Sequence, residues 1–420
     1  MKRYARSLRR WKEYCRFVIP GSATISKEPH IYTFGAYPIF IASGKGSTLV
    51  DVDGNAYIDY QGALGATILG VSYPRVNAAI RAQLEKGTLF SYSQDLQIGL
   101  AKRICAAVPS AERVRFVKNG SDATSAAVRI ARAFTGRSVI ASCHFHGWHD
   151  WFYVSTNLKR GIPEACAKGI VTFPYNDLLA LEKVFREHPG EIAAVILEPV
   201  HLEPPKQGYL RALKALVHKH GALLIFDEVV TGFRFSLGGA QALYHVTPDL
   251  TTLAKALGNG TSIAAVAGKR RIMDATADVI TSMTYAEETL PMAAAIATID
   301  ELKRKPVHAH IWRLGERFQR GYNALAQRSG IPTKCIGLPP RLELTFADHR
   351  GTSRRHLKAF FLQETAREGV LFGIHIFMTY AHTQRQIDET LRLCARVFAR
   401  IAKHGSRPLP LEGELPRELW

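Results

Sequence analysis

The stretch that decides the fold runs from residue 227 to residue 260 and reads DEVVTGFRFSLGGAQALYHVTPDLTTLAKALGNG. An apolar run at 222–226, typical of a buried strand, comes directly before it, so Asp227 stands at a strand end. Ligands bind at the carboxyl ends of parallel strands. A carboxylate at that position can hold the protonated ring nitrogen of a cofactor. On this feature alone, Asp227 as an ordinary loop-starting residue is an equally good interpretation.

The same stretch contains Lys255, which lies between an apolar segment and the glycine-rich turn at 258–260. A lysine in such a place is expected to lose hydration, and this favours the neutral amine that forms imines. Most lysines are solvated surface charges, so Lys255 needs support from other motifs.

A phosphate-binding turn is predicted upstream, at residues 117–123 (VKNGSDA). An apolar strand at 114–117 runs into this turn, and a helix follows. We expect Ser121 to be the helix N-cap and Gly120 to allow close approach of the backbone. Free N–H groups at a helix N-terminus attract phosphate. Gly-Ser before a helix is more often only a cap, so the signal is weak by itself.

An aromatic and histidine-rich motif, HFHGWH at 144–149, follows the predicted strand at 138–142. Its three histidines raise the possibility of a metal site. No cysteine or carboxylate completes a recognisable ligand set nearby, so we predict no metal. The aromatic ring of Phe145 could instead stack on a planar cofactor.

Buried strands and helices alternate between residues 57 and 268, which indicates an α/β domain with a mainly parallel sheet covered on both faces. The predicted strands are 114–117, 138–142, 192–197, 222–226 and 263–267, and the predicted helices are 76–86, 96–107, 122–134, 178–187 and 210–220.

The two ends of the chain have a different pattern. Residues 48–60 predict a hairpin that turns at Asp53-Gly54. After Pro291, long helical segments alternate with short strands, notably 341–346. We therefore expect a second, α+β unit built from both chain ends. Its predicted helices are 292–305, 311–328, 354–367 and 386–402.

Taken together and in this order, the motifs resemble the class III aminotransferases, which have the pyridoxal-5′-phosphate (PLP) fold type I. Within that family the chain is most similar to the glutamate-1-semialdehyde aminomutase branch. The resemblance runs from about residue 20 to residue 383, and its most specific part is 227–260. It implies a large domain with a mainly parallel mixed sheet covered by helices, plus a smaller α+β domain. The expected boundaries are 1–60 and 286–420 for the small domain and 61–285 for the large one.

The resemblance also implies a role for each matching position. Lys255 would hold PLP as a Schiff base and act as a base, and Asp227 would keep the pyridine nitrogen protonated. Thr284 would reach the phosphate of the neighbouring subunit, which implies a homodimer with shared active sites. The other implied cofactor contacts are Gly120 and Ser121 at the phosphate, Phe145 and Val229 on the two ring faces, and His146 and Glu198.

The chain departs from the family pattern in two places. The glycine-rich segment expected after Thr284 is here AEETL at 286–290, and residues 21–27 lack the Pro-Val-Arg signal of true aminomutases. We therefore predict an aminotransferase that acts on another aldehyde or ketone, such as a sugar or an intermediate of specialised metabolism. The aminomutase reaction remains the alternative.

Composition narrows the class of protein further. The chain has 420 residues, 47% of them hydrophobic and 22% charged, and no apolar stretch long enough for a membrane helix. Six scattered cysteines without a Cys-x-x-Cys pair predict a reducing, cytoplasmic location. The net charge of +19 is spread along the chain. We interpret it as a basic surface or a field that attracts anionic substrates. A nucleic-acid-binding protein is the alternative from another class, but we predict no nucleic-acid partner and no membrane partner.

Overall fold

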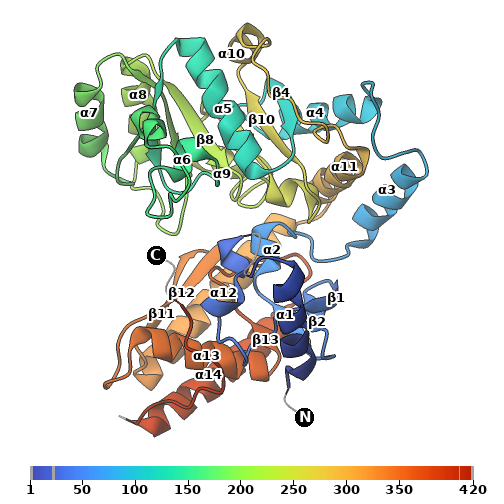
Figure 1. Ribbon diagram of the computed structural model, residues 1–420, viewed down its shortest axis with the longest axis vertical. Helices are drawn as coiled ribbons and strands as arrows, with labels where there is room; N and C mark the ends of the chain where they lie inside the picture. The colour runs from blue at the N-terminus through green and yellow to red at the C-terminus, as the bar shows by residue number, and fades with distance from the viewer. Residues whose placement is uncertain (1–2, 21–23, 406, 418–420) are drawn as a thin grey trace. The chain divides into compact units, whose positions relative to one another are not determined.

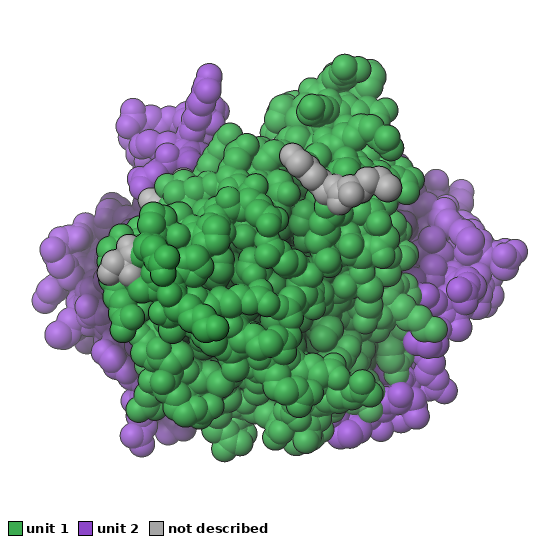
Figure 2. Space-filling view, turned by 90° about the horizontal axis from the view of Figure 1, so that it is seen from below, with its two compact units in different colours: residues 1–73, 309–420 green, residues 74–308 purple. Residues whose placement is uncertain are grey.

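The structure is a computed structural model that describes residues 3–20, 24–405 and 407–417 (Figure 1). The chain divides into two compact units, coloured separately in Figure 2. Unit 1 comprises residues 1–73 and 309–420, and unit 2 comprises residues 74–308. The divisions predicted from sequence are 60/61 and 285/286. The second division lies later because helix α11 (Thr289–Arg304) packs against α3 (Pro74–Leu84) and therefore belongs to unit 2.

Unit 2 is built on a seven-stranded sheet in the order β4-β10-β9-β8-β7-β5-β6. Only β10 runs against its neighbours, so the carboxyl ends of the other six strands lie at one edge of the sheet. In chain order the strands are β4 (Arg113–Val117), β5 (Val139–Cys143), β6 (Ile170–Thr172), β7 (Ile192–Leu197), β8 (Leu223–Glu228), β9 (Leu250–Leu253) and β10 (Ala264–Gly268).

Both faces of this sheet are buried, because alternate strand residues belong to two separate cores. Ile225 of β8 packs in the core that includes α5 (Gly120–Thr135). Its neighbours Leu224 and Phe226 pack in the core that includes α7 (Leu178–Glu187) and α8 (Tyr209–Lys219). The predicted sheet, covered by helices on both faces, is thus confirmed.

The long elements of unit 2 follow the predictions closely, and α4 (Asp95–Ala107) matches its predicted range to within one residue. Two short strands, β6 and β9, were not predicted. Both strands are short, and β9 contains two threonines, so neither has a long apolar run. Three short helices were not predicted either: α6 (Asp150–Tyr153), α9 (Gly239–Tyr244) and α10 (Arg270–Ala275).

Unit 1 is α+β, as predicted. The expected hairpin forms from β2 (Thr48–Asp51) and β3 (Ala56–Asp59), and Gly54 takes the positive φ of +88° that this turn requires. Helix α1 (Ala5–Phe17) was not predicted. Its first turn is held by the carboxylate of Asp53, which accepts hydrogen bonds from the backbone N–H groups of Arg6 and Ser7 at 2.7 and 2.9 Å. The other elements are α2 (Gly62–Gly65), β1 (Ile41–Lys45), α12 (Val307–Ser329), β11 (Thr333–Leu338), β12 (Arg341–Phe346), α13 (Arg354–Arg367), β13 (Val370–Leu371) and α14 (Gln384–His404).

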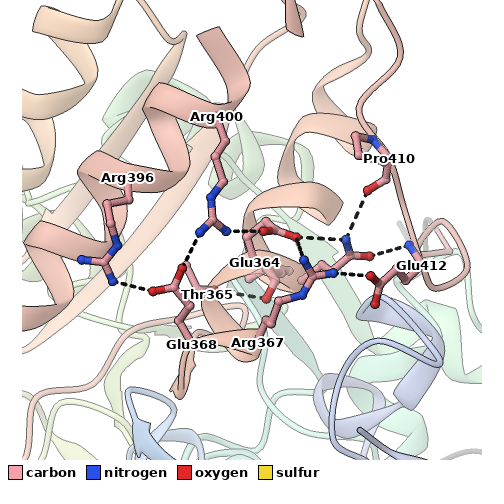
Figure 3. Close-up of polar contacts among 10 residues, drawn as sticks. Glu364, Thr365, Arg367, Glu368, Arg396, Arg400, Pro410 and Glu412 are labelled. Carbon is pink, nitrogen blue, oxygen red and sulfur yellow. Dashed lines mark hydrogen bonds and ion pairs between the residues drawn. The ribbon is translucent and has the colours of Figure 1, made fainter. Parts of the chain in front are cut away.

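An ion-pair network joins the last helices of unit 1 to the C-terminal segment (Figure 3). Arg400 of α14 bridges the buried carboxylate of Glu364 and the carboxylate of Glu368, at 2.5 and 2.8 Å. Arg367 pairs with Glu364 at 3.2 Å and with Glu412 at 2.5 Å. The segment after α14 is therefore fastened to α13 by charge as well as by packing.

Three further features of the chain were considered from sequence: the segment at 21–27, a membrane helix and a metal site. Gly21 to Ala23, within the segment that lacks the aminomutase signal, lie outside the described residues. Along the described ranges, no helix is both long and apolar enough to cross a membrane. In the same ranges, no three His, Cys, Asp or Glu side chains are grouped so that they could hold a metal ion.

Candidate active site

The chemical motifs found in the sequence meet at the carboxyl edge of the unit 2 sheet. Asp227 is the penultimate residue of β8, Glu198 follows β7, and the 144–149 loop follows β5. The turn at 119–121 follows β4, and Lys255 follows β9. Residues from five strands, distant in sequence, are thus brought to one edge, where α/β sheets bind ligands.

Asp227 is held in a buried niche by three groups. It is 4% exposed. Its Oδ1 accepts hydrogen bonds from Thr252 Oγ1 at 2.9 Å and from the backbone N–H of Val229 at 3.1 Å, and its Oδ2 lies 2.7 Å from Nδ1 of His146. These contacts fix the plane of the carboxylate.

The proton arrangement of the His146–Asp227 pair follows from its partners. Nε2 of His146 lies 2.8 Å from the main-chain oxygen of Cys143. A carbonyl oxygen only accepts, so Nε2 must carry a hydrogen. The contact between Nδ1 and Asp227 then needs a second proton, shared between an imidazole nitrogen and a carboxylate oxygen. A charge-assisted hydrogen bond of this kind is stronger than a neutral one.

Lys255 lies one strand away from Asp227. In the register of β8 and β9, Thr252 is opposite Asp227 and Leu253 is opposite Glu228, so Lys255 begins just beyond the strand end. Its side chain is half-buried, and its φ of +46° is in the left-handed region. A non-glycine residue in this region carries local strain, which proteins often hold at functional sites.

The turn predicted to bind phosphate differs from the prediction in one respect. Helix α5 begins at Gly120, and its N-cap is Asn119, not Ser121. Oδ1 of Asn119 accepts from the N–H groups of Ser121 and Asp122 at 2.9 and 3.2 Å, and Asp122 Oδ2 accepts from the N–H of Asn119 at 2.9 Å. Ser121 therefore stands in the first helical turn. The pattern Asn-x-x-Asp is a capping signal in the sequence that could have identified Asn119.

Two close approaches fix the surroundings of this turn. A Cβ on Gly120 would lie 2.9 Å from Cγ1 of Val229, and a Cβ on Gly147 would lie 2.4 Å from Oγ of Ser121. The backbone N–H of Trp148 also donates to Ser121 Oγ at 3.3 Å. Both glycines are therefore required for packing, and they bring Val229 and the 144–149 loop against the start of α5.

The other predicted site residues make their contacts with residues other than Asp227. Phe145 is 52% exposed and meets Phe152 edge-on at 5.5 Å between ring centroids. Glu198 is buried, with Oε1 3.8 Å from Nε2 of His201. Thr284 is exposed. The structure thus joins Asp227, His146 and Val229 by direct contacts.

Glu228, beside Asp227, has a different environment. It is fully buried and accepts hydrogen bonds from the N–H and side-chain amide of Gln241, both at 3.0 Å, from Ala240 N and from Thr231 Oγ1. Burial raises the pKa of this carboxyl group, and the hydrogen bonds oppose the rise. Glu228 thereby closes the 229–238 loop, whose first residue, Val229, contacts Gly120 and Asp227.

The residues at this edge fit a flat, phosphorylated cofactor with a protonated ring nitrogen. A buried and rigid carboxylate faces the edge, a helix start with a crowded glycine lies on one side, and a lysine follows the neighbouring strand. Comparison with known proteins agrees with this fit, because the family model for "Aminotransferase class-III" matches residues 32–397.

The chain belongs to the class III aminotransferases. The cofactor of this aminotransferase is PLP, and its fold is PLP fold type I. It is 36% identical over 409 residues to a 3-aminobutyryl-CoA aminotransferase of Cloacimonas acidaminovorans (strain Evry), covering 95% of this chain and 98% of that protein. It is 35% identical over 403 residues to glutamate-1-semialdehyde 2,1-aminomutase 2 of Brevibacillus brevis, covering 89% and 94%.

A solved structure is similar over nearly the whole aminotransferase. It is the PLP internal aldimine form of the FumI protein of Sphingopyxis sp. MTA144, with a TM-score of 0.90 and 28% sequence identity. The match covers 97% of this chain and 99% of that one. The resemblance inferred from the motifs is therefore confirmed for family, fold and cofactor.

Proposed function

We propose that this protein is a transaminase that moves an amino group from an amino donor to an aldehyde or ketone on a separate molecule. The observation that carries the proposal is the rigid, buried Asp227 carboxylate, one strand away from Lys255 at the ligand-binding edge. When bound, PLP supplies an electron-accepting ring that stabilises negative charge on the substrate carbon.

The proposed roles divide between holding the cofactor and moving protons. Asp227, oriented by His146 and Thr252, would hold the ring nitrogen in its protonated form. Lys255 would bind the cofactor through Nζ and, once the amino donor has displaced it, would carry a proton to and from the substrate carbon. A buried carboxylate that is fixed in advance costs no reorganisation during the reaction.

The remaining proposed contacts with the cofactor involve residues at or near the N-terminus of α5. Gly120 and Ser121 would bind the phosphate, and Val229, which packs against Gly120, would cover one face of the ring. Phe145 would stack on the other face, and its exposed ring is available for this contact. Glu198 would support the site from the end of β7.

We propose a homodimer in which Thr284 of each subunit reaches the partner's phosphate site. Large apolar side chains near Thr284 and from the end of α3 to the start of α4 are exposed, which supports an interface at this part of unit 2. They are Leu84, Phe90, Tyr92, Ile98, Ile280 and Tyr285. A groove of about 460 Å³ between α3 and α11, lined by several alanines, is in the same region. Light scattering at several protein concentrations tests this assembly.

The amino acceptor is proposed to be something other than glutamate-1-semialdehyde, because residues 21–27 lack the Pro-Val-Arg signal. The aminomutase reaction is the second candidate, since a relative of that name covers 89% of the chain. The test is to supply glutamate-1-semialdehyde without any amino donor. Quantitative formation of 5-aminolevulinate would establish the aminomutase. Formation of a keto product from an amino donor, in proportion to the aminated acceptor, would establish the transaminase.

A cytoplasmic location is also proposed, because all six cysteines are free thiols. Cell fractionation would test it.

A further inference from the structure

A separate pocket of about 420 Å³ opens on unit 2 beside the α5 helix. Its floor is one stripe of α5, formed by residues 125, 128, 129 and 132, which share a face of the helix at this spacing. Its wall is the segment 148–151, where the loop after β5 enters α6. The volume is within the usual range for small-molecule sites.

The floor carries two positive charges, those of Arg129 and Arg132. Arg129 and Arg132 stand three residues apart, where like charges repel each other. Within the described ranges neither is in an ion pair. Arg129 donates to the carbonyl of Ile280 at 2.7 Å, and Arg132 donates to the carbonyls of Ser138 and Gly169 at 2.8 and 3.0 Å.

Those bonds leave both guanidinium groups with N–H donors for a ligand. A guanidinium has five such donors, and the bonds to carbonyls use only part of each set. Burial lowers the pKa of Arg132, a sign that its charge is held where solvent stabilises it poorly. An anion in the pocket would relieve both the repulsion between the arginines and this loss of hydration.

The wall supplies a flat apolar surface and a hydrogen-bond acceptor. Trp148 is 67% exposed, so its indole can stack on a planar ring. Asp150 lines the same pocket with an exposed carboxylate. A carboxylate would repel a phosphate but accept hydrogen bonds from sugar hydroxyls, as acidic residues do with ribose.

The pocket is held in shape by hydrogen bonds between floor and wall. Trp151 Nε1 donates to Ser125 Oγ at 2.9 Å, and Ser125 Oγ lies 2.6 Å from Nδ1 of His149. Since an indole N–H can only donate, the serine hydroxyl hydrogen is available for the imidazole. A site with its wall already fixed loses less entropy when a ligand binds.

We propose that this pocket binds a nucleoside phosphate. The base stacks on Trp148, the ribose hydroxyls meet Asp150, and the phosphates meet Arg129 and Arg132. A nucleoside phosphate matches the ring surface, the exposed carboxylate and the paired guanidinium groups together. The assignment is independent of the reaction at the carboxyl edge of the sheet.

Calorimetric titration of the PLP-loaded full-length protein with ADP, adenosine and pyrophosphate tests the proposal. Loading with PLP keeps ADP out of the cofactor's phosphate turn. We expect ADP to bind with a Kd below about 1 mM and the two fragments to bind at least about fivefold more weakly, because each keeps only part of the contacts. Absence of ADP binding up to about 5 mM would overturn the proposal.

Variants locate the site. Arg129→Gln should weaken ADP binding about tenfold, the effect of one charge-assisted hydrogen bond, and Trp148→Ala should weaken ADP but not pyrophosphate. Arg186→Gln removes an exposed charge on α7 and should change ADP binding less than twofold. Equal losses of ADP affinity in Arg129→Gln and Arg186→Gln would indicate that ADP is attracted only by the overall positive charge of the protein. Release of PLP from the wild-type protein on addition of ADP would place ADP at the cofactor turn. Either result contradicts the proposal.

Discussion

Nδ1 of His146 lies 2.7 Å from Oδ2 of Asp227, while Nε2 of the same ring lies 2.8 Å from the carbonyl oxygen of Cys143. Both ring nitrogens therefore face oxygen acceptors in a buried environment. The imidazole holds the carboxylate from one side, and Thr252 holds it from the other at 2.9 Å. This arrangement keeps a negative charge fixed at the end of β8, and two predictions concern it and the neighbouring turn.

Removing the charge of Asp227 should affect catalysis strongly. Asp227→Asn removes the negative partner proposed for the protonated ring nitrogen. A loss of about 3–4 kcal/mol of transition-state stabilisation would lower kcat/KM by roughly 10²–10³-fold. Thr252→Val removes a hydrogen bond to the charged carboxylate, worth about 1.5–3 kcal/mol, and should lower kcat/KM by roughly 10–100-fold. Thr251→Val is the control, because Thr251 bonds to Ser110 and Gln241 rather than to Asp227. Equal losses of kcat/KM in the two threonine variants would contradict the account.

Two variants at the start of α5 should distinguish an effect on PLP binding from an effect on helix stability. Ser121→Ala is expected to weaken PLP binding with little change in melting temperature. Asn119→Ala removes the observed N-cap and should lower stability by about 1 kcal/mol. Equilibrium dialysis of PLP and thermal unfolding of the apoprotein measure the two effects. If Ser121→Ala were the less stable variant, the assignment of Asn119 as the cap would be wrong.

Shared active sites can be tested by mixing two defective variants. Lys255→Ala lacks the proposed covalent contact, and Thr284→Ala lacks the proposed contact with the partner's phosphate. Re-assembly of an equal mixture should give hybrid dimers with one intact site each. Their activity at limiting PLP should reach about a quarter of the wild-type value, from the statistics of pairing in a two-fold dimer. Activity no higher than the mean of the two parents would show that Thr284 acts within its own subunit or not at all.

Asp59, at the end of β3, should make the stability of the protein depend on pH. Burial raises the pKa of Asp59 to about 6, despite hydrogen bonds from the backbone N–H groups of Gln61 and Gly62. An acid whose pKa is raised by folding stabilises the folded state when protonated. Its contribution is complete below the unfolded pKa and is lost as pH rises through about 6.

Asp59→Asn removes this titration. The stability of the wild type relative to the variant should therefore fall by up to about 3 kcal/mol between acidic and neutral pH. Urea unfolding of both proteins at several pH values measures the difference. A difference that does not change with pH would contradict the raised pKa.

Long and apolar elements were predictable from sequence, whereas short elements and contacts between distant residues were not. Strand β7 was predicted with its observed bounds, Ile192–Leu197, because a run of six consecutive apolar residues is typical of a fully buried strand. Strand β9 was not, because four residues with two threonines give no apolar run, although one of them, Thr252, holds Asp227. Helix α1 depends on Asp53, 46 residues beyond Ser7, which no local pattern indicates.

In the candidate site, too, local motifs were predictable from sequence and contacts between distant residues were not. Asp227 and Lys255 stood out because each follows a predicted strand or apolar segment and lies in a specific motif. Ser121 was assigned as the N-cap because serine is a common cap, but Asn119 occupies that position and has an acidic partner three residues later. The contact from His146 to Asp227 joins residues 81 positions apart, and it required the three-dimensional arrangement of β5, β7 and β8.

The most direct test of the central claim, that Lys255 holds the cofactor, is borohydride reduction of the PLP-loaded protein followed by peptide mass mapping. The account predicts that the pyridoxyl group is found on the peptide that contains Lys255, and that Lys255→Ala protein acquires none. A pyridoxyl group on another lysine of the wild type, or stoichiometric labelling of Lys255→Ala, would contradict it.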